Sequence, residues 1–143
     1  MPDDSAAARH DGVAYLDVRA GAYQLRLNGE VIARLDGGSA VLLPGTGALR
    51  DIDIENAIER SEDWLMPFSK LLSGLELRVR DETRRVRKVM GEQGSFTAED
   101  VEQVFTRVFD AVGYGRAIGR DVLADVVLVR ELVHHGRIAR VWV

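Results

Sequence analysis

The residues best suited to chemistry lie near the end of the chain, in the sequence Glu131-Leu-Val-His134. A glutamate and a histidine three positions apart on a helix face the same side and can share one metal ion, as in carboxylate-bridged di-metal bundles. Such a site needs further carboxylates, and Glu59 and Glu62 could supply them because they follow Glu55 at helical spacing. The sequence therefore offers Glu131, His134, Glu59 and Glu62 as candidate ligands of a divalent metal.

The same residues also have an ordinary structural explanation. Positive charge at His134 and His135 suits the last turn of a helix. The acidic ridge, defined as Glu55, Glu59, Glu62 and Asp63, borders an apolar face, which is typical of an amphipathic helix. A bundle site also needs a second Glu-x-x-His motif, and the sequence has none. This favours a protein with no cofactor, with a divalent metal as the alternative.

A second candidate is the basic run, defined as residues 78–88, which contains five arginines and one lysine. Such a run can bind an anionic ligand or nucleic acid. No aromatic residue interrupts it to stack on bases, and the whole chain has a net charge of −4 and a pI of about 5.4. We therefore consider nucleic acid an unlikely partner and expect the run to face acidic groups of the same chain or of a second copy.

Several other chemistries are excluded or disfavoured. The chain has no cysteine, so thiolate catalysis and cysteine-based metal sites are absent. No serine lies in a G-x-S-x-G motif. The glycine-rich stretches 45–51 and 113–119 resemble phosphate loops only loosely, and the second is one residue too long and follows a helix instead of a strand, so we interpret both as turns.

The candidate ligands Glu131 and His134 lie within the most apolar stretch of the chain, residues 121–136. The length of this stretch favours a helix, and its apolar residues surround most of the helix, so we expect it to be buried. Asp121 is a suitable N-cap residue, and Gly136 is a suitable left-handed residue after the helix end.

The N-terminal part of the chain predicts an antiparallel β-meander. Residues 12–19, 22–27 and 30–35 are β-prone, and the last two stretches are joined by Asn28-Gly29, a strong hairpin signal. Residues 39–45 follow the turn at Gly37-Gly38 and extend the same pattern.

The middle of the chain predicts mainly helices. A helix is expected from about Asp51 to Met66, and Pro67 should end it and start a short second helix. Alternation predicts a strand at 75–81, and residues 82–90 suit a short helix.

The clearest helix follows Thr97, an N-cap residue with acidic neighbours. Its apolar face contains Phe105 and should pack on the 121–136 helix. The last residues, 137–143, are β-prone and suit an edge strand.

These elements predict one α+β domain spanning residues 12–143, β-rich at 12–44 and mainly helical at 51–136. Residues 1–11 are polar, and we expect a disordered tail there. With 46% hydrophobic and 29% charged residues, the composition is that of a globular protein. No run is long enough to span a membrane, and no secretory signal is evident, so a cytoplasmic location is expected.

For function, the main hypothesis is a small soluble interaction or accessory protein that self-associates, with a homodimer and a further protein partner as the expected assemblies. The motive is the strand 137–143, whose free edge would invite pairing with a second copy. The alternative for this strand is that it pairs inside its own sheet, with Trp142 in the core. The alternative is a metal-binding protein or metal-dependent enzyme that uses Glu131, His134, Glu59 and Glu62.

Overall fold

The computed structural model describes residues 12–143, which form a mixed six-stranded sheet with the strand order β3-β2-β1-β4-β6-β5. The expected disordered tail at 1–11 lies outside the described residues. The α+β class is confirmed. The strands are β1 (Val13–Arg19), β2 (Ala22–Leu27), β3 (Glu30–Asp36), β4 (Glu76–Asp81), β5 (Ser95–Phe96) and β6 (Arg140–Trp142).

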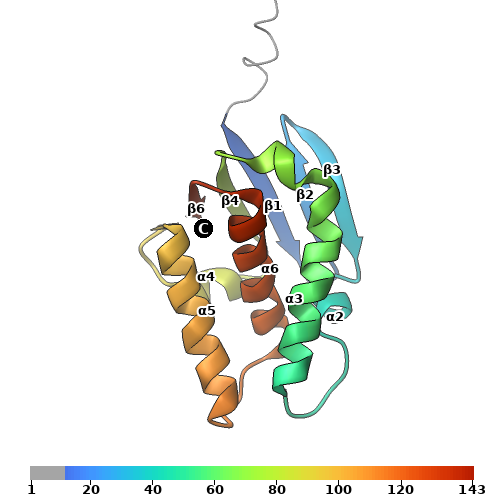
Figure 1. Cartoon of the computed structure of the whole chain (residues 1–143), viewed down its shortest axis with the longest axis vertical. Helices are drawn as coiled ribbons and strands as arrows, with labels where there is room; N and C mark the ends of the chain where they lie inside the picture. The colour runs from blue at the N-terminus through green and yellow to red at the C-terminus, as the bar shows by residue number, and fades with distance from the viewer. Residues whose placement is uncertain (1–11) are drawn as a thin grey trace, which may run out of the picture.

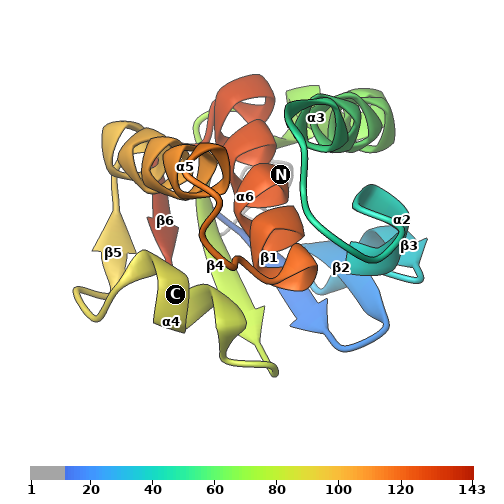
Figure 2. The same ribbon diagram turned by 90° about the horizontal axis from the view of Figure 1, so that it is seen from below.

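Three long helices lie side by side over one face of the sheet, with α6 between α3 and α5 (Figures 1 and 2). Within residues 12–143, no helix has the length and apolar character needed to cross a membrane. The helical segments are α2 (Ser39–Leu42), α3 (Asp51–Leu65), the 3-10 helix η1 (Met66–Leu72), α4 (Arg85–Met90), α5 (Ala98–Gly113) and α6 (Arg120–Gly136).

The predicted meander is confirmed for its first three strands. Strands β1, β2 and β3 pair antiparallel in sequence order. The turn between β2 and β3 has positive φ at Asn28 (55°) and Gly29 (81°), as an Asn-Gly hairpin requires. On β1, the side chains of Ala14, Leu16 and Val18 are buried in the core, in the alternation expected of a strand with one covered face.

The second half of the sheet is parallel. Strand β4 pairs parallel with β1, and β6 pairs parallel with β4. The carboxyl ends of β1, β4 and β6 therefore meet at one edge of the sheet, which we call the carboxyl edge. The opposite edge, where these strands begin, is the amino edge.

The prediction of a C-terminal edge strand is wrong. Strand β6 pairs with β4 on one side and with β5 on the other, so its backbone groups are already bonded within the sheet. The indole N–H of Trp142 donates a 3.0 Å hydrogen bond to Glu76 on β4. The sequence could not show this because β5 is only two residues long and carries little strand signal of its own.

The expected strand at 39–45 is also corrected, since Ser39–Leu42 forms the short helix α2. Gly38 makes this possible: its φ is +57°, and a Cβ there would lie 2.9 Å from the backbone N of Ala22. The chain therefore turns sharply against β2 and buries Leu42 and Leu43. A short apolar segment of this kind is compatible with a helix or a strand, and the tight turn at Gly38 favours the helix.

Helix α6 is buried as expected, with Leu123, Leu128 and Leu132 fully covered. Its ends differ from the prediction. The N-cap is Gly119, with Asp121 in the first turn, and Arg137 adopts the left-handed conformation expected of Gly136. Gly136 lies inside the helix, where a Cβ would approach the Leu72 side chain to 3.0 Å, so glycine allows close packing on η1.

Helices α3 and α5 have the predicted boundaries to within one or two residues. Pro67 marks the change from α3 to η1. Thr97 caps α5 by accepting a hydrogen bond from the backbone N–H of Asp100, whose side chain accepts one from Thr97 in return. The apolar face with Phe105 packs on α6, which confirms that prediction.

Candidate functional site

The carboxyl edge gathers polar side chains from separate elements. Strand β4 ends at Asp81, and the Asp81 carboxylate accepts hydrogen bonds from the backbone N–H groups of Thr83, Val86 and Arg87 and from the Thr83 hydroxyl. This carboxylate holds the loop before α4 in place, with Arg84 in a left-handed conformation (φ 64°). These backbone N–H groups therefore already donate to the Asp81 carboxylate and are not available to a bound anion.

A buried ion-pair network lies behind this loop. Asp125, on α6, has a fully buried side chain. Arg85 donates to both of its oxygens, over 2.9 and 3.1 Å, and the Tyr23 hydroxyl donates to it from β2. Asp121 lies 3.5 Å from the same guanidinium but is half exposed. The network ties β2, α4 and α6 together at the carboxyl edge.

The charge states in this network follow from its burial. Burial raises the pKa of the Tyr23 hydroxyl far above its usual range, and the adjacent Asp125 adds to the effect. Burial also raises the pKa of Asp125, although the hydrogen bonds from Arg85 and Tyr23 oppose this rise. The hydrogen bond to Asp125 raises the pKa of Arg85. Tyr23 is therefore a permanent hydrogen-bond donor and an unsuitable acid or base at neutral pH.

A cavity of about 280 Å³ opens at the carboxyl edge. It lies where β4 and β6 end and is lined by Val79, Asp81, Arg84, Arg87 and Val143. Arg84 and Arg87 are exposed, and neither pairs with a carboxylate in the part of the chain that the structure describes. Open α/β sheets bind their ligands outside the carboxyl ends of the strands, so this cavity is a candidate anion site.

The basic run is thus divided between two roles. Arg85 is used within the fold, as expected for a run that faces acidic groups of the same chain. Arg78 lies over the Trp142 ring at 5.4 Å, on the sheet. Arg84 and Arg87 remain free for a ligand.

A second cluster lies at the amino edge, between α3 and α6. Glu62, Glu131 and His135 place one potential ligand atom each within 4.8 Å of one another. The Nε2 atom of His135 lies 2.7 Å from Glu62 Oε2 and 3.2 Å from Glu131 Oε1. Two of the four residues suggested by the sequence, Glu131 and Glu62, are therefore brought together.

The other two suggested residues lie outside this cluster. Glu59 is exposed on α3, and His134 is exposed on α6 beside a different cavity. The histidine that joins the carboxylates is His135, four residues after Glu131 instead of three. Helical spacing allows either histidine, and the position of α3 selects His135.

The rest of the acidic ridge behaves as a solvated face. Glu55 and Asp63 are exposed along with Glu59, whereas Glu62 is partly covered by α6. Within the acidic ridge, only Glu62 therefore differs from the solvent-exposed face of an ordinary amphipathic helix.

The pKa of Glu131 is raised because its side chain is buried. Arg130 opposes this rise, and the nearby Glu62 carboxylate adds to it. The Arg130 guanidinium donates to Glu131 Oε2 over 2.9 Å and also binds Glu102. Glu131 thus carries a charge that costs free energy in the folded state.

A raised carboxyl pKa predicts a pH dependence of stability. At a pH below the usual pKa of glutamate, Glu131 is protonated in both the folded and the unfolded state. As pH rises, Glu131 loses its proton first in the unfolded chain. With rising pH the wild type should therefore lose stability relative to Glu131→Gln, by about 1.4 kcal/mol per unit of pKa shift.

Denaturant unfolding of both proteins from pH 4 to 7.5, with a chelator present, measures this difference. Glu59→Gln is the control because Glu59 is exposed, and it should follow the wild type. A constant difference between wild type and Glu131→Gln across this range contradicts the assignment of a raised pKa.

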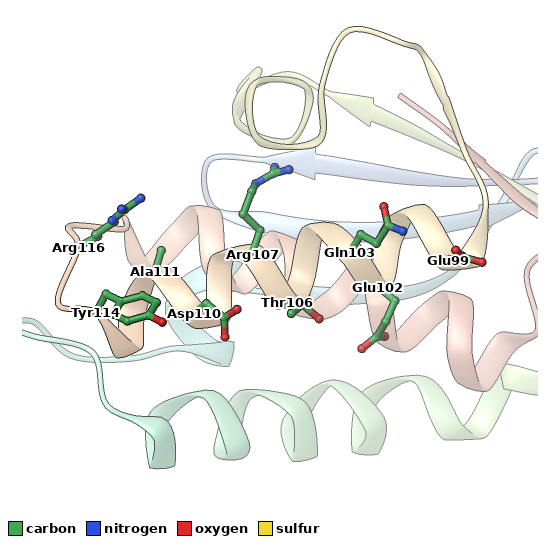
Figure 3. Close-up of a pocket in the computed structure, with 9 residues that line it drawn as sticks. All are labelled: Glu99, Glu102, Gln103, Thr106, Arg107, Asp110, Ala111, Tyr114 and Arg116. Carbon is green, nitrogen blue, oxygen red and sulfur yellow. The ribbon is translucent and has the colours of Figure 1, made fainter.

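A larger, open hollow of about 560 Å³ runs along α5 (Figure 3). All of its lining residues come from α5 and the segment that follows it, and each polar side chain among them is exposed. Tyr114 is 81% exposed at one end. Without a buried polar group or a second element to close it, this hollow is a weaker candidate than the carboxyl edge.

Sequence reasoning missed the carboxyl-edge residues Tyr23, Asp125, Arg84 and Arg87 as a group. The sequence did contain a signal for Asp125: it is a single acidic residue among apolar residues of α6, nearly all of which are buried. A buried carboxylate requires a partner, and Arg85 is the partner. The identity of that partner depends on how α4 packs against α6.

The sequence matches no protein-family model, and no curated protein matches it. Solved structures share its fold. A PPX-GPPA enzyme from Aquifex aeolicus superposes with a TM-score of 0.59 and 11% identity, covering 91% of this chain and 52% of that one. An exopolyphosphatase-like protein superposes with a TM-score of 0.61 and 11% identity, covering 89% of this chain and 50% of that one. An exopolyphosphatase from Cytophaga hutchinsonii superposes with a TM-score of 0.51 and 14% identity, covering 91% of this chain and 52% of that one.

This likeness corrects the main functional hypothesis from the sequence. The structures that share the fold are described as phosphatases and exopolyphosphatases, so the reading of a small interaction or accessory module is wrong. The alternative, a metal-dependent enzyme, agrees better with these descriptions. The chain spans about half the length of these proteins, and at this identity the likeness is one of fold.

Proposed function

We propose that this chain is one half of a phosphate-cleaving enzyme and that it binds the phosphate groups of a polyanionic substrate at its carboxyl edge. Two findings support this proposal. The solved proteins with this fold include exopolyphosphatases, and the chain corresponds to about half of each. The carboxyl edge also has free cationic side chains beside a cavity.

The observation that carries the proposal is the position of Arg84 and Arg87. Both line the cavity, and both are exposed. A guanidinium presents several N–H donors in one plane, a geometry that suits the oxygens of a phosphate. Because Asp81 already occupies the backbone donors of the loop, these two side chains would supply the anion contacts.

The buried network positions these arginines. Arg85 follows Arg84 directly, and its bidentate hydrogen bonds to the buried Asp125 fix the start of α4. The flanking Arg84 and Arg87 are thereby held outward on a short, anchored segment. We assign substrate binding to this chain and the remainder of the reaction to a second domain or chain, which the length of the matched phosphatases implies.

Tripolyphosphate is a suitable probe of this site. We expect the full chain to bind it, with an affinity that falls as salt rises, because the contacts are between charges. Isothermal titration calorimetry should show a loss of about tenfold or more in affinity for Arg84→Ala/Arg87→Ala, since hydrogen bonds to charged groups each contribute about 1.5–3 kcal/mol.

The matched control is Lys70→Ala/Arg137→Ala, which removes the same charge from exposed residues on the amino side of β4 and β6. This variant should bind tripolyphosphate nearly as well as the wild type. Equal losses in both double variants would indicate a general charge effect, and no binding by the wild type would reject the anion site.

Two further expectations remain proposals. The first is the cytoplasmic location expected from the sequence. Self-association as a homodimer is also still a prediction, although β6 cannot be its surface because both of its sides are paired. The free outer edge of the sheet at β3, with Val31 half exposed, is the strand available to a second copy.

A further inference from the structure

The cluster at the amino edge has the donor atoms of a transition-metal site. One imidazole and two carboxylates are contributed by two different helices, and their ligand atoms converge within 4.8 Å. Histidine nitrogen and carboxylate oxygen are both ordinary ligands of Zn²⁺. Three protein ligands with a fourth position left for water form a common arrangement for this metal.

The spacing requires only small adjustments. Ligand atoms about 2.0–2.2 Å from a tetrahedral Zn²⁺ lie roughly 3.3–3.6 Å from one another. His135 Nε2 is 3.2 Å from Glu131 Oε1, close to that value, and 2.7 Å from Glu62 Oε2. A rotation of the partly exposed Glu62 side chain would open the shorter distance, while Glu131 stays fixed.

Glu131 is held in place by neighbours that do not enter the cluster. Arg130 binds Glu131 Oε2, which leaves Oε1 directed toward His135. Arg130 is itself fixed by Glu102 and lies 4.2 Å over the Phe105 ring. Outer partners of this kind orient metal-binding carboxylates in proteins.

The arrangement also creates a demand for positive charge. The buried Glu131 carboxylate lies close to the Glu62 carboxylate, and both face His135. Two carboxylates close together in a partly buried place repel each other. A divalent cation bound between them would relieve this repulsion.

We propose that Glu62, Glu131 and His135 bind a divalent transition metal of the Zn²⁺ class and thereby join α3 to α6. This site lies at the amino edge, apart from the anion site proposed at the carboxyl edge, and does not depend on it. A metal bound there would link the C-terminal halves of α3 and α6, which lie side by side over the sheet (Figures 1 and 2).

Neighbouring histidines provide a matched test. His134 and His135 are adjacent on α6, but His134 is exposed and outside the cluster. We expect Zn²⁺ to raise the melting temperature of the chelator-treated full chain and of His134→Ala to a similar extent, because binding to the folded state adds stability. The rise should be abolished in His135→Ala and in Glu62→Gln, each compared with its own metal-free protein.

Co²⁺ gives a second readout that does not depend on stability. Bound in a four-coordinate site of these ligands, it should produce the visible absorption of tetrahedral Co²⁺ in the wild type and in His134→Ala. Titration should show an affinity at least about tenfold lower in Glu62→Gln, since that is the usual scale for loss of even an outer partner.

Three results would overturn the proposal: no binding of Zn²⁺ or Co²⁺ by the wild type, the same response in His135→Ala as in the wild type, or loss of the response in His134→Ala alone. If His135→Ala is too unstable to measure, Glu62→Gln decides the question, because Glu62 is partly exposed.

Discussion

Replacing Asp125 by alanine should lower the free energy of unfolding by about 3–5 kcal/mol, the usual cost of removing one partner of a buried ion pair. The Asp125 side chain is fully buried, and Arg85, which is 16% exposed, has its strongest contacts with it. The substitution leaves the Arg85 guanidinium and the Tyr23 hydroxyl without their common acceptor. Urea unfolding at neutral pH measures the loss.

Asp121 provides the control for this prediction. It also lies near Arg85, at 3.5 Å, but it is half exposed, and exposed ion pairs contribute about 0–1 kcal/mol. Asp121→Ala should therefore cost less than about 1 kcal/mol. If Asp125→Ala is as mild as Asp121→Ala, the network does not hold α4 against α6, and the positioning of Arg84 and Arg87 needs another explanation.

Phe105→Ala should lower the free energy of unfolding by a similar amount, about 3–5 kcal/mol, because it opens a cavity between α5 and α6. Phe105 is only 8% exposed, stacks against Phe109 at 5.9 Å, and lies under the Arg130 guanidinium. The same substitution removes one support of Arg130. Thermal unfolding followed by circular dichroism is a direct measurement.

Tyr114→Ala is the matched comparison, since Tyr114 is an aromatic residue at the end of the same helix and is 81% exposed. Its loss should change stability by no more than about 0.5 kcal/mol. A near-equal effect of the two substitutions would show that the face of α5 bearing Phe105 is not the one packed on α6.

Local signals in the sequence were sufficient for most of the elements. Asn28-Gly29 predicted a hairpin because two adjacent positive φ angles suit those residues. Thr97 predicted the start of α5 because its side chain bonds the first free N–H groups of the helix. Pro67 predicted the end of α3 because it cannot continue the helix undisturbed. Each of these effects acts within a few residues.

Where prediction failed, the deciding contact was distant in sequence. The close approach of Gly38 to Ala22 determines the turn into α2, and the contact of Gly136 with Leu72 explains why glycine lies inside α6. Strand β6 became internal because β5 pairs with it across more than 40 residues. Residue type alone does not encode such contacts.

The candidate sites show the same division. The sequence by itself determined that Glu131 and a following histidine share a helix face, because positions three and four residues apart are neighbours on any α-helix. Only the tertiary structure decided that Glu62 of α3 meets His135 and leaves His134 in solvent. It likewise paired Asp125 with Arg85, 40 residues away, because α4 and α6 pack together and a buried charge must find a partner.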